Sequence, residues 1–130
     1  AAYRRISGAF DLVPIAADSE RGLGRPQRAL DMVTQFESEK LDADTRTELF
    51  IVAGGARRDL KDDDAARVLL QKAVRAAKSP IAMARSRFAL GDLLADQGDV
   101  EQARKWLQNA MDIDEEGSWT DAAGRLQSLA

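Results

Sequence analysis

Two arginines that lie 37 residues apart, Arg21 and Arg58, are the side chains of this sequence best suited to hold a charged ligand. A guanidinium group donates paired hydrogen bonds to a carboxylate or a phosphate, and it stays charged at physiological pH. If both arginines occupy equivalent positions of a repeated unit, we expect the two guanidiniums to stack along one groove. The alternative is that each is an exposed arginine in a surface ion pair that contributes little stability.

Acidic residues near the C-terminus resemble the first half of a calcium-binding loop, with Asp112, Asp114, Glu116 and Gly117 at the required spacing. The twelfth position of an EF-hand loop carries a glutamate that binds the ion through both oxygens. Ala123 stands at that position here. We therefore interpret the stretch as the solvated acidic end of a helix.

Two further motifs have simpler structural explanations. The run Asp62 to Asp64 could bind a metal ion, but acidic residues also cap and stabilise the N-terminus of a helix. Gly22 and Gly24 lack the third glycine and the preceding strand of a dinucleotide-binding loop, so they predict a turn that ends a helix. We expect no metal and no cofactor.

Histidine and cysteine are both absent from the 130 residues. This excludes histidine general bases, thiolate nucleophiles and zinc sites built from the two residue types. The 22 acidic residues form carboxylate pairs by chance, and no pair has an apolar pocket that the sequence can identify. We therefore expect no catalytic site and no enzyme activity.

The charge balance and the hydropathy limit the kinds of partner that this protein can have. With 22 acidic and 19 basic residues, the net charge is -3, which opposes binding to nucleic-acid phosphates. No apolar run approaches the roughly 20 residues that a membrane-spanning helix needs. We expect a cytoplasmic protein with neither nucleic-acid nor membrane partners. The chain opens at Ala1 without Met, so we expect residues to be missing upstream, and the repeat spacing of the chain predicts that residues 1–7 are the remnant of an upstream helix.

Self-similarity at a fixed spacing organises the chain. Ala103 to Met111 matches Ala66 to Val74 at five of nine positions, with an offset of 37 residues. The same offset relates three small residues, Gly91, Gly54 and Ala17. A period of this length is typical of stacked helical hairpins. It predicts one domain over residues 1–130, with hairpins at about 11–39, 44–77 and 80–114.

Helix start and stop signals support the first two hairpins. Gly24 ends one predicted helix, and Pro26 begins the next. In the second hairpin, Asp44 or Thr45 is the expected N-cap, and Glu48 completes a capping box.

The third hairpin opens at Ser79 and Pro80, and Gly98 divides its two helices. After Gly117, Ser118 is the expected cap of a last amphipathic helix over residues 118–129. We expect this helix to cover the end of the third hairpin. Its apolar face contains Trp119, Ala122, Ala123, Leu126 and Leu129.

The third hairpin resembles a tetratricopeptide repeat, whose usual period is 34 residues. The connections at residues 37–44 and 77–80 can accommodate the additional length. The resemblance implies an all-α, right-handed superhelix of about three hairpins plus a capping helix. The residues that carry the resemblance are Leu90, Gly91, Leu94, Ala103, Leu107 and Ala110.

In such a superhelix the first helices of successive repeats line a concave groove, so the resemblance implies a set of groove residues. One well-described subclass clamps a C-terminal carboxylate with Lys and Asn side chains; here Asp18, Gly55 and Asp92 stand at the Asn positions, which argues against that activity. The implied partner-binding residues are Asp18, Arg21, Glu48, Ile51, Arg58, Arg85, Phe88, Asp92 and Asp96.

The segments Asp18 to Ala29 and Ile51 to Leu60 also resemble an actinobacterial tetratricopeptide-repeat family of unassigned function. The resemblance covers most of the chain and implies a longer parent protein. It favours a non-catalytic scaffold that binds a protein or peptide in the concave groove. The alternative is a structural or oligomerising segment, in which a second copy or other helices of a larger repeat protein fill the groove.

Overall fold

The computed structural model describes residues 12–130, and all regular structure in that range is α-helical. The expected remnant at residues 1–7 lies outside the described range. No helix between residues 12 and 130 is long and apolar enough to cross a membrane. The helices are α2 (Leu12–Gly22), α3 (Pro26–Phe36), α4 (Ala43–Asp59), α5 (Asp63–Ala76), α6 (Pro80–Asp96), α7 (Val100–Ile113) and α8 (Ala122–Gln127).

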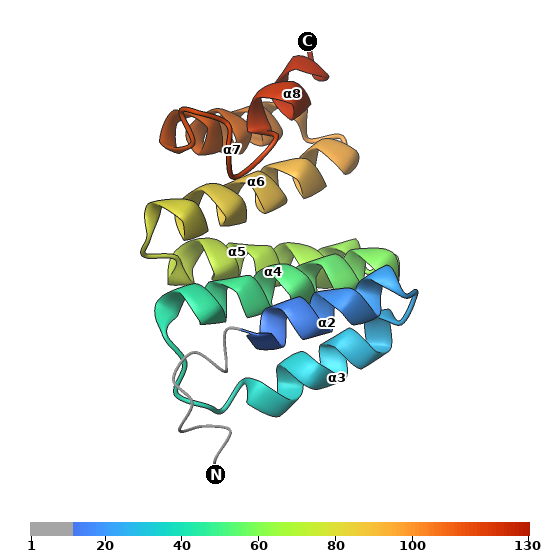
Figure 1. The fold of residues 1–130 in the computed structure, drawn as a ribbon. Coiled ribbons are helices and arrows are strands. Elements are labelled where there is room, and N and C mark those ends of the chain that lie inside the picture. Colours follow the sequence, from blue (N-terminus) through green and yellow to red (C-terminus); the bar gives the residue numbers. More distant parts are fainter. Residues whose placement is uncertain (1–11) are drawn as a thin grey trace.

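Sequence neighbours pack as hairpins: α2 with α3, α4 with α5, and α6 with α7. The first helices also contact one another, α2 with α4 and α4 with α6, so the hairpins stack in chain order (Figure 1). The short helix α8 packs on α7 at the C-terminal end of the stack. The expected all-α helical-repeat fold is confirmed.

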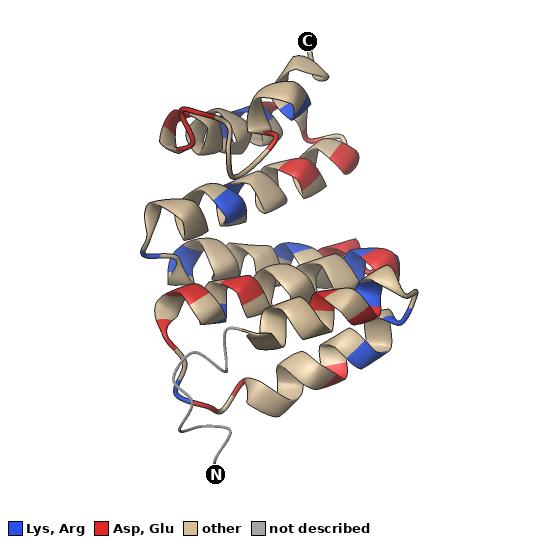
Figure 2. Cartoon of the chain, viewed as in Figure 1, with Lys and Arg blue, Asp and Glu red and all other residues tan. Residues whose placement is uncertain are grey.

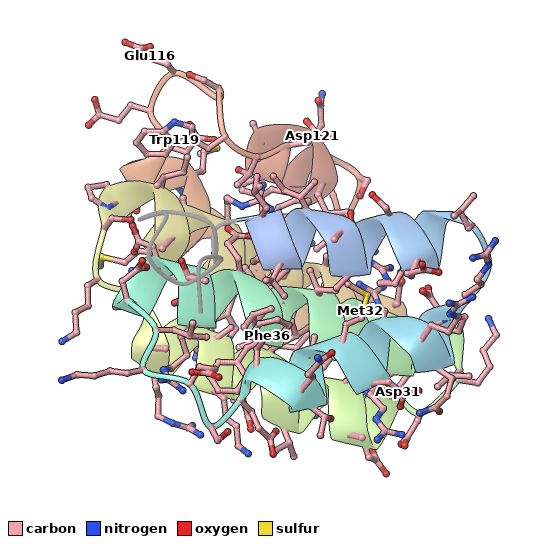
Figure 3. All side chains as sticks on the ribbon, turned by 60° about the horizontal axis from the view of Figure 1, so that its bottom comes forward. Asp31, Met32, Phe36, Glu116, Trp119 and Asp121 are labelled. Carbon is pink, nitrogen blue, oxygen red and sulfur yellow. The ribbon has the colours of Figure 1, made fainter. Side chains whose placement is uncertain are left out.

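The core is built from the small residues that the offset of 37 relates. Gly54 lies against Leu70, and Gly91 lies in the same way against Leu107. In the first hairpin the equivalent residues are Ala17 and Val33, both buried in one cluster. An Ala–Val pair has the same number of side-chain carbons as a Gly–Leu pair. The total side-chain volume where the two helices cross is therefore similar in all three hairpins. Met32 and Phe36 of α3 pack against the same cluster (Figure 3).

Four of the helices between residues 12 and 130 begin with a side-chain cap. Asp62 and Ser79 cap α5 and α6, as their sequence positions predict. The prediction of Asp44 or Thr45 as a cap is wrong, because Asp42 accepts a hydrogen bond from the Thr45 N–H at 2.7 Å and α4 begins at Ala43. Glu48 completes no capping box, since its carboxylate binds Arg85. Asp99 caps α7.

The turns inside the three hairpins share one backbone geometry. Gly24, Lys61 and Gly98, each 37 residues from the next, have positive φ angles of 77°, 64° and 85°. In each turn the following N–H donates to the carbonyl five residues earlier, which closes a helix end of the Schellman type. Lys61 is the only non-glycine residue with positive φ between residues 12 and 130.

The last helix is shorter than predicted. Residues 118–129 were expected to be helical with Ser118 as the cap, but α8 spans only Ala122–Gln127. The reason is that the Asp114 carboxylate accepts hydrogen bonds from the N–H groups of Ser118, Trp119 and Thr120, which fixes this stretch as a turn. Trp119 therefore precedes the helix and is 38% exposed.

Candidate partner-binding groove

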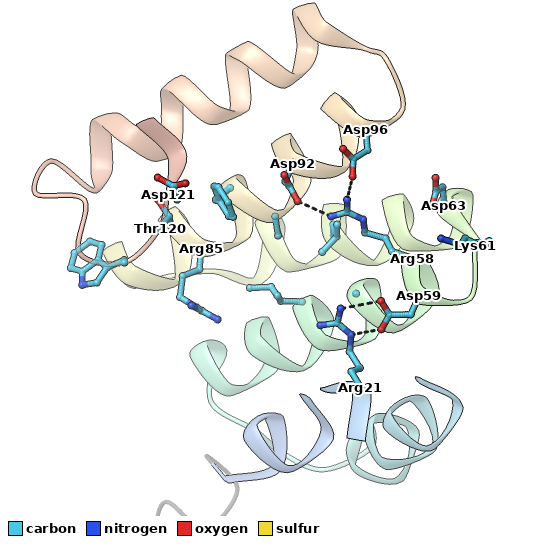
Figure 4. Close-up of a pocket in the computed structure, with 16 residues that line it drawn as sticks. Arg21, Arg58, Asp59, Lys61, Asp63, Arg85, Asp92, Asp96, Thr120 and Asp121 are labelled. Atoms are coloured by element: carbon cyan, nitrogen blue, oxygen red, sulfur yellow. Dashed lines mark hydrogen bonds and ion pairs between the residues drawn. The ribbon is translucent and has the colours of Figure 1, made fainter. Parts of the chain in front are cut away.

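The predicted groove residues lie on α2, α4 and α6 and line two adjoining hollows. Figure 4 shows the residues that line the smaller one. The hollow toward the C-terminal ends of these helices has a volume of about 690 Å³. The hollow toward their N-terminal ends has a volume of about 1420 Å³. Arg21, Ile51 and Arg85 belong to both hollows, so the two form one continuous concave face. The other residues of the predicted set are Asp18, Glu48, Arg58, Phe88, Asp92 and Asp96.

Arg21 of α2 reaches across to α4. Its Nε and Nη2 atoms donate to the two oxygens of Asp59 at 2.8 and 3.3 Å, and its Nη1 donates to Asp18 at 2.9 Å. The hydrogen bond to Asp59 raises the pKa of the Arg21 guanidinium, against the lowering effect of burial. The guanidinium therefore lies against the groove wall, hydrogen-bonded to both carboxylates.

Gly55 gives Arg21 the space for this contact. A Cβ atom at position 55 would lie 2.5 Å from Cζ and 2.6 Å from Nη1 of Arg21. The guanidinium therefore rests directly on the α4 backbone, one helical turn before Asp59. The sequence placed Gly55 in the groove without revealing that it makes this close approach possible.

The next contact of the same kind joins α4 to α6. Arg58 donates to Asp92 at 3.0 Å and also forms a short ion pair with Asp96. The same two carboxylates bind a second arginine from the other side, because Arg125 of α8 donates to Asp92 and Asp96 at 2.7 Å each. Two guanidiniums and two carboxylates thus form one network at the C-terminal end of the groove.

A third ion pair joins the same two helices nearer their N-terminal ends. Arg85 of α6 donates to the two Glu48 oxygens of α4 at 2.6 and 3.0 Å. The hydrogen bond to Glu48 raises the pKa of Arg85, again against the effect of burial.

The paired arginines form what we call the ion-pair ladder: Arg21 with Asp59, Arg58 with Asp92 and Asp96, and Arg85 with Glu48. Each pair connects neighbouring first helices. Figure 2 accordingly shows positive and negative residues interleaved over the stack. Arg21 and Arg58 do occupy equivalent positions, but their guanidiniums bind carboxylates of this chain.

The ion pairs of the groove, and three of the residues that line it, were not found from the sequence. Asp59 and Asp96 each lie 38 residues after the arginine they bind, a spacing that the 37-residue offset could have suggested. Trp119, Thr120 and Asp121 also line the smaller hollow, and they come from the turn before α8. This segment has no equivalent in the other hairpins, so the repeat gave no indication of it.

Asp114 fixes that turn. It is only 4% exposed, and besides the three backbone donors it accepts a hydrogen bond from the Thr120 hydroxyl at 3.0 Å. Burial acts to raise the pKa of this carboxyl, but the hydrogen bonds from Thr120, Trp119 and Ser118 together lower it. Trp119 is thereby held on the outside of the turn, while Glu116 points away from the helices (Figure 3).

This arrangement defines a class of molecule, a helical-repeat protein whose stacked hairpins form a concave face. Residues 84–116, which cover most of α6 and all of α7, match a family model described as a tetratricopeptide repeat. A search of curated proteins found no match. The resemblance of the third hairpin to the tetratricopeptide superfamily is therefore confirmed. Proteins built from this repeat generally serve as scaffolds for protein–protein interactions and are generally not catalysts.

Proposed function

We propose that this chain is a non-catalytic scaffold that receives a peptide or helix of a partner protein in the groove formed by α2, α4 and α6. The observation that carries the proposal is the convergence of side chains from three successive first helices on one continuous hollow face.

The composition of the face supports a peptide as the occupant. Ile51 and Phe88 line it together with Trp119, and the arginines of the ladder surround them. Tryptophan and arginine are enriched among the residues that contribute most to protein–protein binding. Because apolar and charged groups both line the groove, a segment with both kinds of side chain can satisfy them together.

A photo-crosslinking experiment tests this proposal. A benzophenone amino acid is placed at Phe88 in the groove or, as a matched control, at Val68, which is 50% exposed on α5 outside it. We expect a partner to be crosslinked from position 88 in native lysate and not from position 68. The variant Ile51→Asp should reduce this product. Equal yields from both positions, or a product that Ile51→Asp leaves unchanged, would show that the groove is not the binding surface.

A structural or oligomerising segment is the second candidate. It is favoured by Ile15 and Ile81, which are 65% and 42% exposed and line the larger hollow. Light scattering after size-exclusion chromatography distinguishes the candidates. A stable homodimer that Ile15→Asp dissociates would favour self-association over capture of another protein.

A further inference from the structure

The C-terminal segment approaches the groove from the side of α7. Thr120 and Asp121 line the smaller hollow together with Arg58, and Arg125 binds the groove carboxylates Asp92 and Asp96. These two carboxylates were predicted to contact a partner. Part of the predicted binding surface is therefore occupied by a side chain of the protein itself.

Residues 121–130, which we call the strap, have few apolar contacts. The helix within them is six residues long, and Ala122 is its only buried residue. A helix of this length is not stable by itself in water. The strap is held further by Leu129, which packs partly against the core, and by a hydrogen bond from Arg104 to the Leu129 carbonyl at 2.6 Å.

We infer that the strap is a displaceable cover of this end of the groove, and that the partner segment that replaces it brings an arginine or lysine side chain to Asp92 and Asp96. This inference rests on the proposed function and adds to it the charge of the partner and a means of regulation. The turn at residues 114–120, which the Asp114 carboxylate holds through hydrogen bonds, stays in place and connects the strap to α7.

The charge at this position determines the kind of partner. With the strap in place, two carboxylates face two guanidiniums, those of Arg58 and Arg125. When the strap leaves, Arg58 alone faces both carboxylates, and the local charge becomes negative. A basic side chain restores the balance, whereas an acidic segment is repelled. Lys61 and Asp63 line the same hollow with opposite charges, so together they leave this negative charge unchanged.

The strap competes with a partner as a tethered ligand, whose effective concentration is typically in the millimolar range. Removing the guanidinium of Arg125 therefore increases the fraction of molecules that can bind a basic peptide. If that fraction is about a tenth in the unmodified protein, the apparent affinity rises about tenfold.

Fluorescence anisotropy with the full chain tests the inference, with a labelled peptide of six arginines as the probe. We expect Arg125→Gln to tighten binding about tenfold. The matched control is Lys105→Gln on α7, which removes the same charge from an exposed position and should change binding little. A peptide of six citrullines, which has nearly the same shape without the charge, should not bind.

Adding Asp92→Asn and Asp96→Asn to the Arg125→Gln variant should abolish the gain. Equal binding by Arg125→Gln and Lys105→Gln, or equal binding of the arginine and citrulline peptides, would overturn the inference. If the crosslink from position 88 persists in that case, the groove binds a partner that is not basic, and the proposed function stands without the strap.

Displacement itself has a separate readout. The protein has two tryptophans, and Trp106→Phe leaves Trp119, beside the strap, as the only one. We expect its emission to shift as the arginine peptide is added. A peptide that binds without any shift would mean that the strap stays in place and that Arg125 is only a structural contact.

Discussion

The Cβ atom that Gly54 lacks would lie 2.7 Å from Cδ2 of Leu70, a distance too short for two carbon atoms. Gly91 and Leu107 repeat the relationship, with a Cβ to Cγ distance of 2.9 Å. In the first hairpin the same two positions hold Ala17 and Val33. The first side chain is one carbon larger than glycine, and the second is one carbon smaller than leucine. The two helices of each hairpin therefore approach closely, and the smaller residue of one sets the allowed size of the other.

Gly54→Ala is expected to destabilise the fold, although alanine favours helices. Overpacking a core typically costs about 1 to 3 kcal/mol, against a helix-propensity gain of about 1 kcal/mol. The double variant Gly54→Ala/Leu70→Val reproduces the pair of residues found in the first hairpin. It should be more stable than the single variant Leu70→Val. Urea unfolding of the four proteins measures this coupling. Strictly additive effects would mean that the two side chains do not share the space.

Gly55→Ala is expected to behave differently from its neighbour. The new Cβ would meet the guanidinium of Arg21, which is the mobile end of a long side chain and can move into the groove. The lost surface ion pair is worth about 0 to 1 kcal/mol, and the gain in helix propensity is about 1 kcal/mol. The free energy of unfolding should therefore stay the same or rise slightly. A loss comparable with that of Gly54→Ala would show that Arg21 cannot move.

Lys61→Gly is expected to stabilise the protein. Lys61 has φ of 64°, where an L-residue is strained and glycine is not. We expect a gain of about 0.5 to 1 kcal/mol in thermal or urea unfolding. The reverse change at the equivalent turn, Gly98→Ala, should lower stability. A Lys61→Gly variant less stable than the parent would indicate that the lysine side chain stabilises the turn.

Asp114→Asn is expected to destabilise the protein in a way that depends on pH. Because hydrogen bonds lower the pKa of this carboxyl in the folded state, its contribution is present above the unfolded pKa of about 4. The contribution is lost as the pH falls through the lower folded pKa. Melting curves of the parent and the variant should differ at pH 7 and converge at acidic pH. A difference that is constant down to pH 3 would exclude the carboxylate charge as the cause.

The offset of 37 made much of this architecture predictable. It related Gly54 to Gly91 before their contacts with leucines were known. Together with the resemblance to a tetratricopeptide repeat, it assigned Arg21, Arg58 and Asp92 to one face. This works because each hairpin meets the same packing requirement as the next. Four of the residues that carry the resemblance to the repeat, Leu90, Leu94, Ala103 and Leu107, are all buried.

The sequence did not reveal which of several similar groups forms a given hydrogen bond, because that choice depends on local geometry. Asp42 and Asp44 are both good helix caps, and only the path of the loop decides between them. Trp119 fits an amphipathic helix, but Asp114 binds the N–H groups that such a helix would leave free. The contact of Arg21 with Asp59 likewise depends on its guanidinium resting on Gly55, which no spacing rule reports.

The ion-pair ladder has a mechanical consequence. Its contacts join the first helices on the groove side of the stack, whereas apolar clusters hold the helices together behind the groove, both within and between hairpins. Salt weakens solvent-exposed ion pairs, and it leaves apolar packing intact. We therefore expect dissolved ions to act on the curvature of the solenoid, so that the width of the groove follows the ionic strength while each hairpin keeps its form.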